Sequence, residues 1–201
     1  MKKLPHQERT FIILKPDTVQ RSLIGEAVKR IEQTGLKCTA VKMFTPDEKR
    51  LLEHYSKSDE WFTSKGEKVV ADLKSQGLPV DREPIEYGKD IIRTIVTYMT
   101  SGPAVAMVWE GNQAVKVVMK MVGTTEPATS DVGTIRGDYT IDSYAHASLE
   151  NRAVRNLVHC SDAPEEAERE IAIWLKEDEI MNYTTAQERI LYDVNLDGKP
   201  E

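Results

Sequence analysis

The chain has 201 residues, of which 40% are hydrophobic and 30% are charged, and its formal net charge is −6. We interpret this length as one domain, residues 1–201, that carries insertions. The acidic balance argues against a nucleic-acid or membrane surface as the main partner, so an anionic ligand would need a local cluster of cations. The two cysteines are too few for a disulfide framework, no His or Cys spacing indicates a metal site, and no eighteen apolar residues run together. We therefore expect a cytoplasmic protein.

The first part of the chain is predicted to alternate strands and helices. Arg9 to Lys15 is a β-branched and aromatic run, which indicates a buried strand with the lysine at its carboxyl end. Apolar residues from Ile24 to Ile31 follow helical spacing, and Leu36 to Phe44 is typical of a second strand. Thr45 is predicted to be the N-cap of a helix that ends near Tyr55.

The middle of the chain is predicted to hold three helices around one strand. Helices are expected from Lys65 to Gln76 and from Lys89 to Met99. Ala104 to Trp109 is almost continuously apolar, as expected of a strand at the centre of a sheet. Helical spacing returns from Ala114 to Met121. The next residues, Thr124 to Asp138, are rich in Thr, Pro, Gly and Asp and predict a long functional loop.

The last part of the chain is predicted to complete the sheet. A short strand is expected from Tyr139 to Asp142, and the stretch Asn156 to Asp162 delivers His159 to the end of another strand. A helix that carries Glu170 follows. Strands joined by crossover helices, with an antiparallel partner, indicate an α+β sandwich of the split βαβ type.

His159 is the candidate nucleophile. Neutral imidazole attacks an electrophile without prior deprotonation, and Glu170 lies within two helical turns, where it could accept the other ring N–H. A lone histidine at a strand end is nevertheless more often a structural residue. His54 has no evident partner set, and a packing or solvated role is expected for it.

Several polar residues lie at the predicted strand ends and in the long loop: Lys15, Tyr55, Thr125, Arg136, Asn156 and His159. Cations and neutral donors around a nucleophile are suited to a phosphate chain, because phosphoryl transfer needs mainly positioning and charge neutralisation. The sequence has neither a P-loop nor a kinase glycine-rich loop, so a nucleotide would not be held in either of these ways.

These residues fall in stretches that together resemble the nucleoside diphosphate kinase family. The matching motifs are ERTFIILKPD with VQR (Glu8 to Arg21), EHY (Glu53 to Tyr55), SGPAVAMVWEG (Ser101 to Gly111), GTIRGD (Gly133 to Asp138) and RNLVHCSD (Arg155 to Asp162), followed by Glu170. The resemblance implies a ferredoxin-like βαββαβ sandwich, in which helices cover an antiparallel sheet, and an enzyme that assembles as a homo-oligomer, either a hexamer or a tetramer.

The implied reaction is a ping-pong exchange of the terminal phosphate between ATP, or another nucleoside triphosphate, and a nucleoside diphosphate. The resemblance implies that His159 carries the phosphoryl group on its δ nitrogen, that Glu170 orients the ring and that Ser161 supports it. Lys15, Tyr55, Thr125, Arg136 and Asn156 match the family's phosphate and sugar ligands. Mg²⁺ is expected to enter with the nucleotide, without protein metal ligands. Trp61 or Phe62 is the candidate stacking face for the base, which would leave the enzyme indifferent to base identity.

One departure from the family pattern concerns charge. The family's second phosphate-binding arginine aligns with Met119, which carries none. Lys120 is adjacent and Lys116 lies one turn back, so a lysine could supply the charge without the fork of an arginine. The alternative is that Met119 is simply a rim residue and that nucleotide binding is weaker.

Two further departures are insertions. Residues from Thr63 to about Ile92 exceed the family's usual connection, which suggests either an enlarged lid over the nucleotide or a surface elaboration or subunit contact. A second insertion near residues 143–152 lengthens the link to His159 and could affect assembly or flank the site.

Two other functions fit the same residues. A regulatory module could bind nucleotide without turnover, in which case ADP would bind tightly without forming phosphohistidine. A relay protein could pass the phosphoryl group to protein partners, in which case free GDP or CDP would not accept it.

Overall fold

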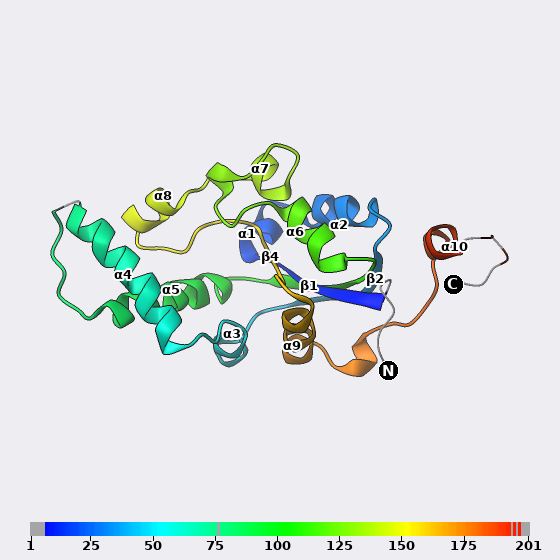
Figure 1. Cartoon of the computed structure of the whole chain (residues 1–201), viewed down its shortest axis with the longest axis horizontal. Coiled ribbons are helices and arrows are strands. Elements are labelled where there is room, and N and C mark those ends of the chain that lie inside the picture. Colours follow the sequence, from blue (N-terminus) through cyan, green and yellow to red (C-terminus); the bar gives the residue numbers. More distant parts are fainter. Residues whose placement is uncertain (1–6, 76, 194, 196, 198–201) are drawn as a thin grey trace.

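Four strands form one antiparallel sheet, in the spatial order β2-β3-β1-β4. Figure 1 shows helices on both sides of β1 and β2. The computed structural model describes residues 7–75, 77–193, 195 and 197. The strands are β1 (Glu8–Leu14), β2 (Lys37–Phe44), β3 (Ala104–Gly111) and β4 (Val158–Cys160). The connections from β1 to β2 and from β3 to β4 join strands that are not neighbours, as in a split βαβ unit, whereas the connection from β2 to β3 joins neighbours.

The central strands β1 and β3 are apolar because both of their faces are covered. Phe11 and Ile13 of β1 face one hydrophobic cluster, while Ile12 and Leu14 face the other. All four side chains are fully buried. Alternate residues of a strand point to opposite faces, so a continuous apolar run is what a sheet between two helical layers requires.

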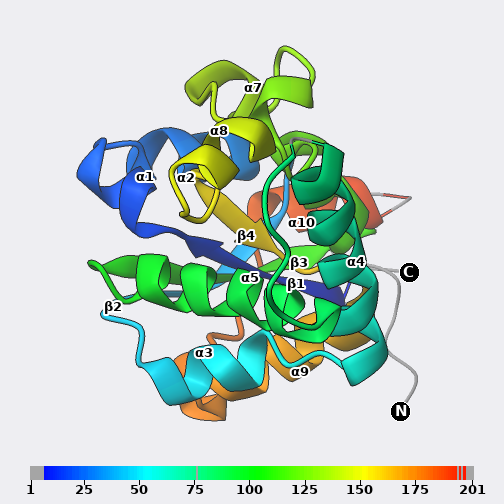
Figure 2. The same ribbon diagram turned by 90° about the vertical axis from the view of Figure 1, so that its left-hand side faces the viewer.

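Two helical layers cover the sheet, as Figure 2 shows. One cluster joins the sheet to α2 (Ile24–Glu32), α6 (Ala114–Val122) and α7 (Ile135–Tyr139). The other joins it to α3 (Glu48–His54), α5 (Pro84–Met99) and α9 (Pro164–Trp174). The remaining elements are α1 (Pro16–Gln20), α4 (Asp59–Ser75), η2 (Pro127–Thr129), α8 (Tyr144–Leu149), η3 (Glu177–Glu179) and α10 (Ala186–Tyr192).

Two local predictions are wrong. Residues 139–142 form no strand, because Thr134 caps α7 by accepting a hydrogen bond from Gly137 N at 3.0 Å, so the helix continues to Tyr139. Asp142 then pairs with the Arg152 guanidinium instead of entering the sheet. The N-cap of α3 is Asp47 and not Thr45.

Helices α4 and α5 form a hairpin at one end of the molecule (Figure 1). α4 begins at Asp59 and α5 at Pro84, both earlier than predicted, and Gln76 lies outside the described residues. The two helices cross at glycines: a Cβ on Gly66 would lie 1.6 Å from Pro84 O, and one on Gly88 would lie 2.0 Å from Phe62 O. This close approach requires residues without side chains.

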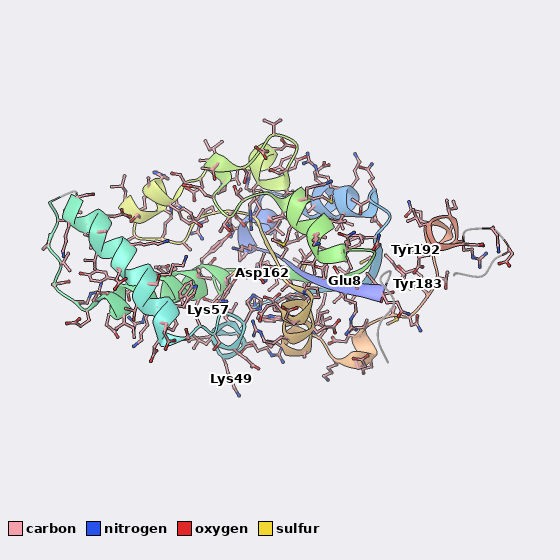
Figure 3. The ribbon with its side chains drawn as sticks, in the orientation of Figure 1. Glu8, Lys49, Lys57, Asp162, Tyr183 and Tyr192 are labelled. Carbon is pink, nitrogen blue, oxygen red and sulfur yellow. The ribbon has the colours of Figure 1, made fainter. Side chains whose placement is uncertain are left out.

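The chain after α9 returns across the edge strand β2. The hydroxyl of Tyr183 donates to Cys38 O at 2.7 Å, and the hydroxyl of Tyr192 accepts from Asn112 N at 3.1 Å; both tyrosines are labelled in Figure 3. Among the described residues, no helix combines the length and apolarity needed to cross a bilayer.

Replacing Gly88 with alanine should destabilise the hairpin by about 2 kcal/mol, because the new methyl group meets backbone that cannot move independently. The matched control is Gly25→Ala in α2, where nothing lies within 4 Å of the added Cβ. That change should be neutral or stabilising by up to about 1 kcal/mol. Denaturant unfolding of the two variants measures both effects, and equal stability of the two would contradict the close approach.

Candidate active site

A strained turn begins β4, the strand that carries His159. Val158 N donates to Asn156 O at 2.7 Å, which makes a γ-turn centred on Leu157, whose φ is +66°. Such a φ is unfavourable for a branched side chain, and the surrounding structure must hold it. Leu157 O accepts from Lys15 N at 2.8 Å and Leu157 N donates to Asp17 at 3.2 Å. The turn is therefore fixed to the end of β1.

The imidazole of His159 is aligned by a buried carboxylate. His159 Nε2 lies 2.9 Å from Glu170 Oε1, and the hydroxyl of Ser161 donates to Glu170 Oε2 at 2.5 Å. Glu170 is 4% exposed and Ser161 is 1% exposed. Because a carboxylate accepts hydrogen bonds, this contact places the ring proton on Nε2 and leaves the Nδ1 lone pair for an electrophile.

Lys15 and Asn156 form a buried pair at the end of β1. Lys15 Nζ donates to Asn156 Oδ1 at 2.7 Å, and Asn156 Nδ2 donates to the backbone oxygen of Thr125 at 2.8 Å. Burial, followed by repulsion from Arg136, lowers the pKa of Lys15 from 10.5 to about 8. The lysine is therefore a cation that gains stability when an anion arrives.

Arg136 connects the long loop to β4. Its Nε donates to Asn156 O, its Nη1 donates to Gly123 O and Thr124 O, and its Nη2 donates to Val158 O, at distances from 2.6 to 3.1 Å. A guanidinium has five N–H groups, so one, on Nη2, remains for a ligand. Arg136 is 7% exposed, and burial lowers its pKa. Arg136, which is predicted to bind phosphate, therefore also acts as a clamp that holds four backbone carbonyl groups together.

Tyr55 places a hydroxyl near the histidine. Its ring centroid lies 6.0 Å from that of His159, and among the described residues its buried hydroxyl has no hydrogen-bond partner. Burial and then the charge of Glu170 raise its pKa. The group is therefore a neutral donor that a phosphate oxygen could satisfy.

The other predicted residues lie at the periphery. The side chains of Thr125 and Lys120 are exposed, and Met119 is 40% exposed. Within the described chain, Lys120 makes no hydrogen bond or ion pair to the other site residues. Trp61 and Phe62 are half-buried near the start of α4 and pack edge to face, with ring centroids 5.5 Å apart.

His54, for which a packing or solvated role was expected, is packed beside the site. It ends α3, is 2% exposed, and its ring centroid lies 4.4 Å from that of His159. The sequence signal for its place in the site is its position beside Tyr55 in the EHY motif.

A surface groove of about 500 Å³ lies between α3 and α9, lined by Glu53, Ser56, Lys57, Glu166, Arg169, Ala172 and Ile173. Its lining contains none of Lys15, Arg136 and His159. The candidate site is therefore defined by the convergence of its polar side chains and not by this groove.

An imidazole held by a carboxylate, beside buried cations and a free hydroxyl, is suited to carrying a phosphoryl group. These features define the class of a phosphotransferase, with His159 as the candidate nucleophile.

Comparison with known proteins gives the family. The profile described as "Nucleoside diphosphate kinase" matches residues 8–72 and 85–180. A nucleoside diphosphate kinase from Pyrobaculum aerophilum is 46% identical over 179 residues, which cover 87% of this chain and 98% of that protein. The crystal structure of an NDP kinase from the same organism covers 88% of this chain and 100% of its own, at 45% identity and a TM-score of 0.82.

A second solved structure carries ligands. It is a transition-state mimic of nucleoside-diphosphate kinase from Borrelia burgdorferi with bound vanadate and ADP; it is 31% identical, covers 91% of this chain and 95% of its own, and has a TM-score of 0.74. The chain belongs to the nucleoside diphosphate kinase family, and its activity is phosphoryl transfer from a nucleoside triphosphate to a nucleoside diphosphate.

Nucleotide affinity should depend on the charge of Lys15. Its cation is complete below its pKa of about 8 and is lost as the pH rises through that value. The affinity for ADP should therefore fall by about tenfold between pH 7 and pH 9. Calorimetric titration across this range measures the change. Lys15→Met should bind ADP more weakly than the wild type at pH 7, and its affinity should fall little further up to pH 9. An equal fall in affinity in both proteins would contradict the role of the Lys15 charge.

Proposed function

We propose that His159 is the residue that carries the phosphoryl group. The Nδ1 lone pair attacks the terminal phosphorus of a nucleoside triphosphate, an N–P bond forms, and the bond from phosphorus to the bridging oxygen breaks. The electron pair of that bond leaves with the diphosphate, so no external oxidant or base is needed. The contact between His159 Nε2 and Glu170 Oε1, 2.9 Å long, is the observation that carries this proposal.

The second half of the exchange reverses these bonds. A terminal oxygen of a nucleoside diphosphate attacks the phosphorus, the N–P bond breaks, and its electron pair returns to Nδ1. The Nε2 proton remains between the imidazole and the carboxylate in both directions, so Glu170 stabilises the positive charge that develops on the ring.

Five residues are proposed to hold the phosphates and the sugar. Lys15 supplies a cation, and Asn156 and Tyr55 supply neutral polar groups. The one N–H of Arg136 that makes no backbone hydrogen bond supplies a charged donor. Thr125, exposed on the loop, is proposed to contact the phosphates at the mouth of the site. Charge neutralisation and positioning are what phosphoryl transfer requires of a protein.

Mg²⁺ is proposed to be held by the nucleotide phosphates. The described residues offer one cluster of metal-ligating type, His54, His159 and Glu170. Two imidazoles and one carboxylate do not suit a hard cation that prefers oxygen ligands and octahedral geometry. The ligand atoms of this cluster therefore fit a reaction in which Mg²⁺ enters bound to the nucleotide. When bound, Mg²⁺ would neutralise phosphate charge.

The α4–α5 hairpin is proposed to cover the nucleotide, within the ferredoxin-like βαββαβ sandwich. The family match stops at residue 72 and resumes at residue 85, inside the proposed insertion 63–92. Trp61 or Phe62, at the start of α4, is proposed to stack on the base, which would allow several bases. The segment near residues 143–152 contains α8 and is proposed as the second insertion. We further propose a cytoplasmic homo-oligomer, either a hexamer or a tetramer.

The decisive experiment is a label transfer. The protein is incubated with γ-labelled ATP and then with unlabelled GDP. We expect an acid-labile label on the wild-type chain that GDP discharges within the turnover time, and none on His159→Ala. A label that GDP cannot discharge would favour a relay protein, and tight ADP binding without any label would favour a regulatory module.

Introducing the missing cation should strengthen nucleotide use. Met119→Arg is expected to raise kcat/KM by about tenfold, mainly through a lower KM, because a charge-assisted contact to phosphate is restored. Steady-state kinetics with ATP and a fixed diphosphate measure this.

The single variants Lys120→Ala and Lys116→Ala show whether either lysine supplies the charge that Met119 lacks. Loss of several-fold in kcat/KM at one position only would identify the compensating residue. Unchanged kinetics in Met119→Arg would contradict the phosphate contact at this position.

A further inference from the structure

His54 is a buried histidine that the transfer chemistry does not use. It is the last residue of α3, its side chain is fully buried, and its ring meets that of His159 edge to face, with an interplanar angle of 75° and centroids 4.4 Å apart. His54 Nε2 has no hydrogen-bond partner among the described residues, and it lies 3.7 Å from Glu170 Oε1. A buried polar atom without a partner is costly, which calls for a functional explanation.

The tautomer of His54 follows from its other nitrogen. The indole Nε1 of Trp174 donates to His54 Nδ1 at 3.2 Å. Because an indole N–H can only donate, Nδ1 must be the acceptor and the single proton of the neutral ring is on Nε2. Burial, followed by the charges of His159, Arg169, Lys15 and Lys57, lowers the pKa of His54, so the ring stays uncharged. Lys57 is labelled in Figure 3.

Helix α9 holds His54 at both its side chain and its backbone. Arg169 donates to His54 O at 3.0 Å and to Glu53 O at 3.2 Å, and so caps the end of α3. Trp174 lies four residues after Glu170 on the same helix, hence on the same face. Arg169 and Trp174, which flank Glu170 on α9, therefore hold His54, whose Nε2 lies 3.7 Å from Glu170 Oε1.

We propose that His54 is a positioning residue, whose Nε2–H restrains Glu170 Oε1 and thereby the orientation of the His159 ring. The inference rests on the proposed role of His159. At 3.7 Å the contact is longer than a hydrogen bond, so the proposal requires that it shortens during the reaction. With Ser161 donating to Glu170 Oε2, the carboxylate then has protein donors at both of its oxygens.

The same three residues suggest a competing interpretation, a metal site. Their ligand atoms all lie within 4.8 Å of one another. A metal at His54 Nε2 needs a lone pair there, and the ring proton would have to move to Nδ1, where the Trp174 N–H already points. The Trp174 hydrogen bond therefore favours the donor role, and metal binding becomes an outcome of the test.

The test compares two amides at position 54. In His54→Gln, the side-chain nitrogen can reach the position of Nε2 and keep a donor toward Glu170. In His54→Asn, the shorter amide can accept from Trp174 but leaves Glu170 without the donor. We expect His54→Asn to lose about 10- to 100-fold in kcat with KM changed less than about threefold, and His54→Gln to recover about tenfold of that loss. His146→Asn, at an exposed histidine of α8, should behave as the wild type.

Nitrogen-15 NMR of the His159 imidazole provides a readout that packing alone would not change. The wild type should show a single tautomer with the proton on Nε2, and His54→Asn should show a mixture. Equal losses in both amide variants, with an unchanged His159 tautomer and a lower melting temperature, would overturn the proposal and leave a packing role.

Stoichiometric Zn²⁺ tests the competing site. We expect no competition between Zn²⁺ and autophosphorylation in the wild type. Inhibition that His54→Asn relieves would contradict the tautomer assigned from Trp174. Absence of label on the wild-type chain in the ATP experiment would instead reject the role of His159 itself, so the two failures are distinguishable.

Discussion

The contact between His159 and Glu170 is the interaction on which the rest of the site depends. An imidazole on a three-residue strand has little local structure to hold it, and the carboxylate that orients it comes from the following helix. The geometry of the proposed nucleophile therefore depends on how α9 packs on β1. Helix α9 is fixed by apolar residues such as Ile171 and Trp174, which belong to one face of the core. The packing of α9 in the core therefore also determines the alignment of the His159 ring.

A second constraint joins the site to the loop that precedes it. Arg136 bonds to carbonyl oxygens of Gly123, Thr124, Asn156 and Val158, so it ties the end of α6 to both sides of the γ-turn. A buried cation is stable there because four oxygen dipoles surround it. The turn at Leu157 is strained, and this clamp together with the end of β1 keeps it in place. Asn156, beside this turn, accepts a hydrogen bond from Lys15 Nζ at 2.7 Å.

The sequence was sufficient for most of the fold. The four principal strands and their helices follow from runs whose periodicity is strong, as in β1 and β3, where burial on both faces leaves no polar position. The strand predicted at residues 139–142 was wrong because capping by Thr134 and pairing of Asp142 with Arg152 are specific side-chain contacts that periodicity does not register. The hairpin α4–α5 began earlier than predicted, since its crossing depends on two glycines that meet only in three dimensions. Within the site, strand ends led to Lys15 and His159 as candidates, whereas the place of His54 beside His159 could not be predicted because its partner Trp174 is 120 residues away.

The clamp formed by Arg136 has a consequence for how such a chain can diverge. One guanidinium serves the architecture of the loop and is also the proposed grip on the phosphates, so natural variation cannot relax one task without damaging the other. Exposed positions around the site do not have two such roles. Met119, which is 40% exposed on the last turn of α6, is one of them. Changes in nucleotide affinity should therefore accumulate at exposed positions of α6 such as this one, while the buried arginine is retained.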